Sequence, residues 1–336
     1  MFQVNQAFSL HPNKLILYDR FDRVTSDLHH SAYSKFENKK NAITRKFHNF
    51  EISDNAYRTL RSKINWLYYL SKKKDIKLQN GKQIFAFRCA FITLTLPSKQ
   101  LTPTVDVTKR LFNNFLTQLR TKFELSNYVW RLEFQKNGNV HYHMVTDTFV
   151  DYFQVQRIWN SCLSLDGYIE KYATKHQAMS LKNYNDAYNP EGKIDFSIIK
   201  KRFFAGVGSN WQNPNTVDVK SVISKQKIAN YISKYFAKSA AGGSHCNSLD
   251  NPENSKSLRL WFCSRGLSAI KSISDYVDHY AVPLENLVRS IPNFKRIRTD
   301  FCVMYFFDLS KITGFVRKTL ENILKNYAHS VDYVPN

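Results

Sequence analysis

The chain has 336 residues, of which 43% are hydrophobic and 15% aromatic, so it is long and apolar enough for one large domain or two small ones with hydrophobic cores. This content of large apolar side chains excludes a mostly disordered protein. The 49 Lys and Arg residues outnumber the 27 Asp and Glu residues and give a net charge of +22, which favours nucleic acid as a partner over an acidic membrane surface.

The cysteines and the hydropathy pattern narrow the compartment. The five cysteines include no C-x-x-C pair, and an odd number cannot close fully into intramolecular disulfides, so a reducing compartment fits best. Residues 1–5 lack the basic start of a secretion signal, and no apolar run approaches the ~20 residues of a membrane span. We expect a soluble, cytoplasmic protein with no membrane partner.

The first 80 residues predict one helix. Residues 1–52 are basic, polar and aromatic without a clear period, which predicts irregular structure. Ser53 is a good N-cap for an amphipathic helix that runs to the lysines at 72–74, and Asn80-Gly81 then marks a turn. The apolar positions that recur at helical spacing are Tyr57, Leu60, Ile64, Leu67 and Tyr68.

The next segment predicts a strand followed by a helix. Residues 84–96 are rich in Phe, Ile, Thr and Leu and stop at Pro97, which predicts a central strand or a hairpin containing one. Asp106 can cap a helix that we expect to cover one face of the sheet. The apolar positions of this helix are Val107, Leu111, Phe115 and Leu119.

The second half of the chain alternates loops with regular elements. Residues 183–192 and 209–215 are rich in Asn, Asp, Pro and Gly and predict loops. A helix is expected between Ser221 and the glycines at 242–243. The remaining predicted elements are strands at 258–263 and 300–307 and a final amphipathic helix at 310–327.

A pair of histidines lies in the strongest hairpin signal of the chain. Two alternating runs, 128–135 and 140–145, flank the turn dipeptide Asn137-Gly138. His141 and His143 are alternate residues of a strand and point to the same face, so two imidazoles can bind one metal ion. Two ordinary surface histidines are the alternative interpretation.

The turn decides whether a third ligand joins these histidines. A two-residue loop would place Glu133 on the opposite face of the hairpin. A three-residue loop 136–138, with its glycine in the left-handed conformation, pairs Glu133 with His141 and Arg131 with His143. In that register Glu133, His141 and His143 form a site that suits Mg²⁺ or Mn²⁺ acting as a Lewis acid on a phosphate oxygen.

A pair of tyrosines supplies a candidate nucleophile. Tyr231 and Tyr235 are four residues apart on the predicted helix, so their phenol groups share one face. A tyrosinate can attack a phosphodiester, and Lys234 between the two tyrosines can lower a phenol pKa or steady the developing charge.

Two other tyrosine pairs share this spacing. Tyr168 and Tyr172 repeat it together with its lysines, but Glu170 would bring a like charge beside the phosphate, and Tyr168 follows a glycine at the frayed start of its helix. Tyr184 and Tyr188 fall in the predicted loop at 183–192 and are set aside. We therefore prefer the pair at 231 and 235.

Three ordered motifs resemble those of one protein family. They are the FITLT segment at 91–95, the His-Tyr-His triplet at 141–143, and Tyr231-x-x-Lys234-Tyr235. Their order resembles that of HUH-type rolling-circle replication initiators, and the paired tyrosines resemble the two-tyrosine branch typified by gene A proteins of small single-stranded-DNA phages. The resemblance covers roughly residues 85–265.

The resemblance implies an α+β fold, the HUH-endonuclease fold. In that family a central antiparallel sheet of about five strands carries the histidines on a central strand, and helices flank the sheet. The family's usual third ligand lies eight or nine residues before the first histidine, where Glu133 stands; Tyr142 is bulkier than the usual aliphatic residue at its position. We expect a nuclease domain at 81–265, a basic N-terminal extension with a helix at 1–80, and a C-terminal accessory region at 266–336.

The resemblance also implies an activity. A tyrosine would nick single-stranded DNA at a replication origin, leaving a free 3′-OH and a 5′-phosphotyrosine, and the second tyrosine would accept the new 5′ end. The expected DNA contacts are Lys227, Lys238, Arg131 and Arg265. No G-x-x-x-x-G-K-[ST] motif occurs, so we expect a host helicase as a partner, in a bacterial cytoplasm.

Two other classes remain open. A plasmid-mobilisation relaxase or a single-tyrosine transposase would use the same chemistry, although relaxases usually place the tyrosine before the histidines and such transposases are shorter. A non-catalytic single-stranded nucleic-acid-binding protein could use its His pair for a structural metal.

Overall fold

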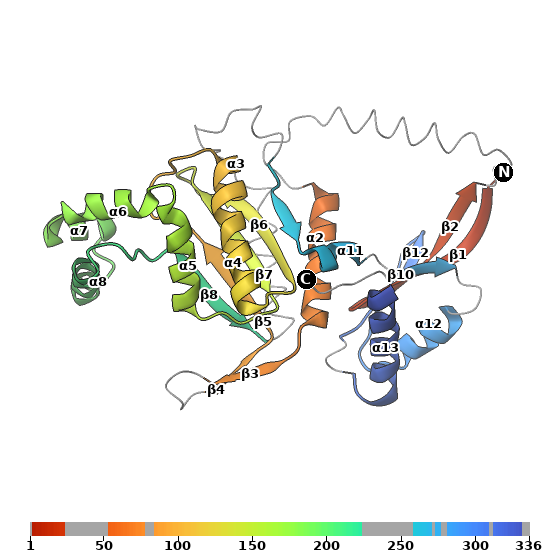
Figure 1. The fold of residues 1–336 in the computed structure, drawn as a ribbon. Coiled ribbons are helices and arrows are strands. Elements are labelled where there is room, and N and C mark those ends of the chain that lie inside the picture. Colours follow the sequence, from red (N-terminus) through yellow and green to blue (C-terminus); the bar gives the residue numbers. More distant parts are fainter. Residues whose placement is uncertain are drawn as a thin grey trace. The chain divides into compact units, whose positions relative to one another are not determined.

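The computed structural model describes residues 2–23, 53–77, 84–223, 258–270, 273–276, 281–308 and 312–330. Its contacts divide the chain into two units, shown in Figure 1. The central unit is Asn49–Ser264, and the terminal unit combines Met1–His48 with Arg265–Asn336. This division runs through the expected segments 1–80 and 266–336, whose status as domains stays a prediction.

A five-stranded antiparallel sheet forms the frame of the central unit, as the α+β HUH-type fold requires. The strand with both histidines is the middle one. In spatial order the strands are β8 (Val217–Val222), β5 (Cys89–Leu94), β7 (Val140–Thr146), β6 (Tyr128–Phe134) and β9 (Trp261–Cys263).

The hairpin of β6 and β7 has the predicted three-residue loop. Gln135 and Asn139 close it, with the Gln135 N–H donating to the Asn139 carbonyl at 2.9 Å, and the Gly138 N–H donates to the Gln135 carbonyl at 2.8 Å. Gly138 has φ +82°, the left-handed conformation that glycine adopts at little cost. This turn confirms the predicted pairing of Glu133 with His141 and of Arg131 with His143.

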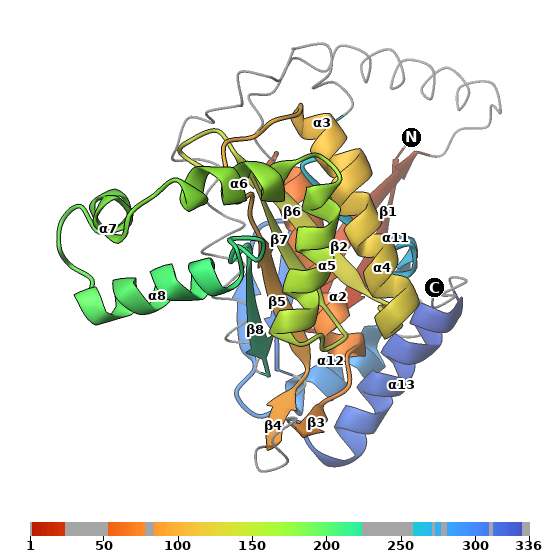
Figure 2. The ribbon, with the colours of Figure 1, turned by 60° about the vertical axis from the view of Figure 1, so that its left-hand side comes forward.

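Helices cover one face of this sheet, as Figure 2 shows for α4 and α5. The helix predicted after Asp106 is confirmed, but it begins with a π-helical turn. The buried side chains of this layer include Ile92, Phe115, Trp130, Tyr142 and Trp159. The elements are α3 (Thr104–Asp106), η1 (Val107–Phe112), α4 (Asn113–Phe123) and α5 (Tyr152–Ser164).

The predicted amphipathic helix α2 (Asp54–Leu70) contacts β6 and β9 and buries Leu60, Ile64 and Leu67. Its N-cap is Ser53, as expected, and the Ser53 hydroxyl accepts the Ala56 N–H at 3.3 Å. A small antiparallel sheet follows, formed by β3 (Lys74–Lys77) and β4 (Ile84–Phe87).

Three helices after α5 form a small aromatic core of their own around Tyr184 and Trp211. The loop predicted at 183–192 is wrong over its first half, because the Ser180 hydroxyl caps a helix at the Asn183 N–H and Tyr184 is buried in this core. Packing of the aromatic ring overrides the loop-forming composition. The helices are α6 (Tyr168–Gln177), α7 (Leu181–Tyr188) and α8 (Phe196–Gly208).

The terminal unit is built on a second five-stranded antiparallel sheet. The prediction of irregular structure for residues 1–52 is wrong at 2–23, where two ten-residue strands pair along their whole length about Pro12-Asn13. The strand and helix predicted near the C-terminus are confirmed as β12 and α13. In spatial order the strands are β10 (Ile273–Tyr276), β1 (Phe2–His11), β2 (Lys14–Arg23), β12 (Cys302–Phe306) and β11 (Lys295–Arg298), and the helices are α11 (Arg265–Ala269), α12 (Ala281–Arg289) and α13 (Gly314–Ser330).

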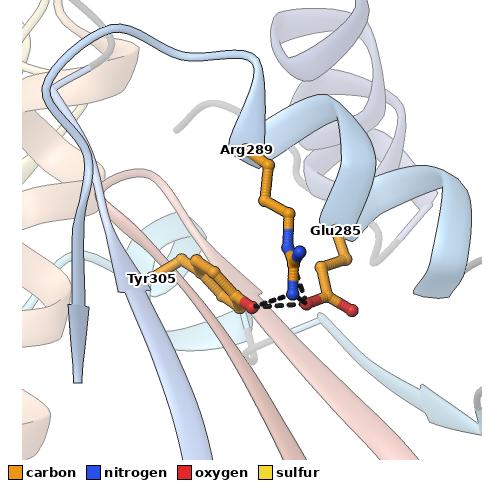
Figure 3. Close-up of polar contacts among 3 residues, drawn as sticks. All are labelled: Glu285, Arg289 and Tyr305. Carbon is orange, nitrogen blue, oxygen red and sulfur yellow. Dashed lines mark hydrogen bonds and ion pairs between the residues drawn. The ribbon is translucent and has the colours of Figure 1, made fainter. Parts of the chain in front are cut away.

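A polar contact ties α12 to this sheet (Figure 3). Arg289 donates to the Glu285 carboxylate through Nε at 3.0 Å and Nη2 at 2.7 Å, and the buried Tyr305 hydroxyl of β12 donates to the same carboxylate oxygen. Among the helices that the structure describes, none has the length and apolar character needed to span a bilayer.

Candidate functional site

The predicted metal ligands lie on the sheet face opposite α4 and α5. His143 of β7 is directly paired with Thr93 of β5 and with Arg131 of β6, and residues paired in this way project to the same side. Thr93 is in turn paired with Asp218 of β8. A row of polar side chains therefore crosses the sheet through the central histidine.

Both nitrogens of His143 have partners within this row. Its Nε2 lies 3.1 Å from Glu133 Oε2, and its Nδ1 lies 3.3 Å from the Thr93 hydroxyl. An ionised carboxylate can only accept, so Nε2 carries the proton, and in the neutral ring Nδ1 accepts from Thr93. Phe91 stacks against the imidazole, with ring centroids 5.7 Å apart. These contacts hold a ring that is only 1% exposed.

His141 lies beside His143 with its ring nitrogen Nε2 buried. The two ring centroids are 4.5 Å apart. Among the described residues, Nε2 of His141 has no hydrogen-bond partner, which is unusual for a buried polar atom. Burial, with a smaller effect of His143, lowers the pKa of His141 to about 4, so its ring is neutral at pH 7. A neutral imidazole is the form that binds metal ions.

Glu133 is the negatively charged member of the group. Burial alone would raise the pKa of Glu133, but the hydrogen bond and charge of His143, together with Arg131 and His141, outweigh burial and lower it. Its side chain remains 28% exposed, so the carboxylate can still be reached from solvent.

The donor set therefore suits Mg²⁺ or Mn²⁺: two imidazoles, one carboxylate and a buried nitrogen without a partner. As placed, however, no group of three or more His, Cys, Asp or Glu side chains in the described part of the chain has the arrangement of a metal site. Glu133 and His143 are instead hydrogen-bonded to each other. Metal binding by these residues stays a prediction.

The predicted DNA contacts differ in their accessibility. Arg131 is only 4% exposed, and burial lowers the pKa of its guanidinium, whereas Arg265 is exposed at the start of α11. Contact of either residue with DNA stays a prediction.

The tyrosine helix predicted between Ser221 and the glycines at 242–243 is only partly within the described residues. Its predicted start is wrong, because Ser221 pairs with Ala90 within strand β8. The other side chains of this prediction lie outside the described residues. They are Lys227, Tyr231, Lys234, Tyr235 and Lys238.

The rival pair Tyr168 and Tyr172 is packed inside the central unit. The phenol oxygen of Tyr168 accepts the Leu101 N–H at 3.0 Å, and the ring is fully buried in the core, so the prediction of a frayed position is wrong. Burial raises the pKa of Tyr172, opposite to the need of a nucleophile. The interpretation of Tyr184 and Tyr188 as loop residues is also wrong, since both belong to α7.

Sequence reasoning did not assign roles to Thr93 and Phe91. Both stand in the FITLT segment and contact His143, although 50 residues separate Thr93 from that histidine. Their alternation on one strand face was visible in the sequence. The partner strand was not.

Residues 89–240 match the family model of the replication-associated protein ORF2. The match spans just under half of the chain and supports a rolling-circle replication initiator. It includes both histidines, β8 and the tyrosines at 231 and 235. Comparison with curated proteins and with solved structures gives no match.

Proposed function

We propose that this protein is an endonuclease that starts rolling-circle replication by nicking single-stranded origin DNA and later rejoining it, as in the two-tyrosine branch of gene A-type proteins. The observation that carries the proposal is the grouping of Glu133, His141 and His143 on one face of the hairpin, with a buried nitrogen of His141 that has no partner among the described residues. The family match over the same region adds support.

Glu133, His141 and His143 would hold Mg²⁺ or Mn²⁺, which when bound supplies Lewis-acid polarisation of a phosphate oxygen. Thr93 would orient His143 in either tautomer, because a hydroxyl can accept from Nδ1 as readily as it donates to it. Phe91 would limit rotation of the same ring.

Tyr231 or Tyr235 would supply the nucleophile. Its phenol oxygen forms a bond to phosphorus while the bond from phosphorus to the 3′ oxygen breaks. The 3′ oxygen takes a proton and leaves as a free 3′-OH, and the 5′-phosphate stays on the tyrosine. Attack by the 3′-OH of the completed strand reverses these steps, so rejoining needs no nucleotide cofactor.

The metal assignment is tested with labelled single-stranded oligonucleotides carrying candidate origin sequences and Mn²⁺. The wild type should form a covalent adduct that resists SDS. His143→Ala should lose the adduct and weaken Mn²⁺ binding measured by calorimetry, while keeping salt-sensitive DNA binding, since Lys and Arg contacts to phosphates dominate affinity. His11→Ala in the terminal unit is the control and should behave as wild type. Cleavage by His143→Ala at the wild-type rate would contradict the assignment.

The nucleophile is tested by mass spectrometry of the trapped adduct. The DNA should be found on Tyr231 or Tyr235, and a variant with both changed to Phe should form none. The matched control changes Tyr168 and Tyr172 to Phe; it should keep the adduct, although loss of the Tyr168 acceptor for the Leu101 N–H should lower stability by about 1–3 kcal/mol. DNA recovered on Tyr168 or Tyr172 would overturn this choice. A gel shift that SDS abolishes, with no adduct at any origin sequence, would favour a non-catalytic binder.

A further inference from the structure

A pocket of about 440 Å³ opens in the central unit on the sheet face opposite the histidines, between the η1–α4 helix and the β6–β9 edge. That volume is within the usual range for small-ligand sites. Phe112, Tyr128 and Trp130 line it and are at most 7% exposed. Phe262, which is half-buried on β9, adds a fourth aromatic ring.

Two cations border these rings. Lys109 is exposed on η1, and Arg259 lies beside β9 with its guanidinium carbon 5.0 Å from the centroid of the Phe262 ring. None of the described side chains that line the pocket is acidic. The pocket thus combines apolar, aromatic walls with positive charge, which is the chemistry that a base and its phosphate require.

The π-helical turn forms one wall of this pocket. Thr108, Lys109 and Phe112 come from η1 and Asn113 from the following turn, where the Asn113 N–H donates to the Thr108 carbonyl across five residues. Runs of π-helix are rare and occur frequently at functional sites. The turn is held by the HUH strand, since Phe112 stacks on Tyr142 with centroids 4.1 Å apart and the Thr108 hydroxyl lies 2.8 Å from the Tyr142 hydroxyl.

We propose that this pocket binds a nucleoside phosphate, with the base against the aromatic wall and the phosphate on Lys109 and Arg259. The ligand is either one unpaired base of a DNA strand or a free nucleotide. This inference goes beyond the nicking chemistry, because the side chains described around the pocket are distinct from those of the histidine face and need neither metal nor tyrosine nucleophile.

The test measures binding to the full-length protein of three probes: a (dT)₁₀ oligonucleotide, 5′-dAMP and inorganic phosphate. Lys109→Gln/Arg259→Gln should weaken nucleotide binding by about fivefold or more, as expected for losing roughly 1 kcal/mol or more of charged contacts. The matched control, Arg120→Gln/Lys122→Gln, removes the same charge from exposed positions of α4 outside the pocket and should have a smaller effect. Phe262→Leu keeps an apolar side chain but removes the ring, and should also weaken binding by about fivefold.

Photocrosslinking then locates the bound base. An oligonucleotide containing 5-iododeoxyuridine should crosslink to the peptides of β6 or β9 that contain Tyr128, Trp130 or Phe262. Binding of both probes with these sensitivities identifies a general nucleotide pocket, and sensitivity with (dT)₁₀ alone identifies a base of the strand as the ligand. Equal losses in the pocket and control variants, crosslinks elsewhere, or phosphate competing as strongly as 5′-dAMP would overturn the proposal. His143→Ala should retain this binding, so failure of the nicking chemistry would be seen separately.

Discussion

At the scale of single residues, Tyr142 connects the two faces of the central sheet. It stands between His141 and His143 in sequence but projects to the opposite side, where it is fully buried against Phe112. The single hydrogen of the Thr108 hydroxyl is donated to a backbone carbonyl at 2.7 Å, so the Tyr142 hydroxyl donates to Thr108. An aliphatic residue at this position would fill part of the space but could not hold the π-helical turn by this hydrogen bond.

The contact of Glu285, Arg289 and Tyr305 gives the terminal unit a pH-dependent contribution to stability. The hydrogen bond from Tyr305, aided by Arg289, lowers the pKa of Glu285 below its ordinary value of 4.5. A carboxylate with a lowered folded-state pKa stabilises the fold above its unfolded pKa, and this stability is lost as the pH falls through the folded pKa.

Tyr305→Phe should therefore lower the free energy of unfolding by about 1–2 kcal/mol at pH 7, with less of a difference below pH 4. Hydrogen exchange of the 302–306 strand at the two pH values measures this effect. The exposed pair Arg317 and Glu321 on α13 supplies the control, since Arg317→Gln should change exchange by less than about 0.5 kcal/mol at either pH. A wild-type-to-Phe difference that does not shrink in acid would contradict the assignment.

At the scale of elements, the end of α8 is shaped by a close approach of Trp211. Asn210 and Trp211 have φ values of +49° and +58°, so the chain reverses and returns the indole to the helix. The Trp211 N–H donates to the Gly206 carbonyl at 2.7 Å, and the ring is 4% exposed in the small aromatic core. A Cβ at Gly206 would lie 2.2 Å from this ring, so only glycine fits there without movement.

Gly206→Ala should thus destabilise the α6–α8 region by about 1–3 kcal/mol, as overpacking of a closed contact does. Gly208→Ala is the matched control: nothing lies within 4 Å of its Cβ, and it should be neutral or stabilise by up to about 1 kcal/mol. Urea unfolding followed by tryptophan fluorescence compares them. Equal midpoints for the two variants would show that the indole is not held against Gly206.

At the scale of the whole molecule, the terminal unit is assembled from both ends of the chain. β2 lies in the middle of its sheet, between β1 and β12, so the C-terminal strands β11 and β12 are joined to β10 only through the N-terminal hairpin. The register pairs Tyr18 with Cys302 and Lys14 with Phe306. Long-range pairing of this kind makes the two ends one cooperative unit.

Deletion of residues 1–23 should consequently expose the 302–306 and 295–298 strands to rapid hydrogen exchange, because the sheet loses its two central connections. Exchange in β5 and β7 of the central unit, measured in the same sample, serves as the internal control. Unchanged protection at 302–306 would show that residues 266–336 fold on their own, as the division expected from the sequence implies.

Local interactions account for what the sequence determined by itself. The amphipathic helix after Ser53, the hairpin and its three-residue turn depend on residues close in the chain, and that turn alone brings Glu133 to the face of His141 and His143. Only the tertiary structure decided that Thr93 lies beside His143, that β12 pairs with β2, and that Tyr168 is buried, because these contacts join segments separated by up to about 290 residues. They are selected by packing and by strand partners that no local pattern specifies.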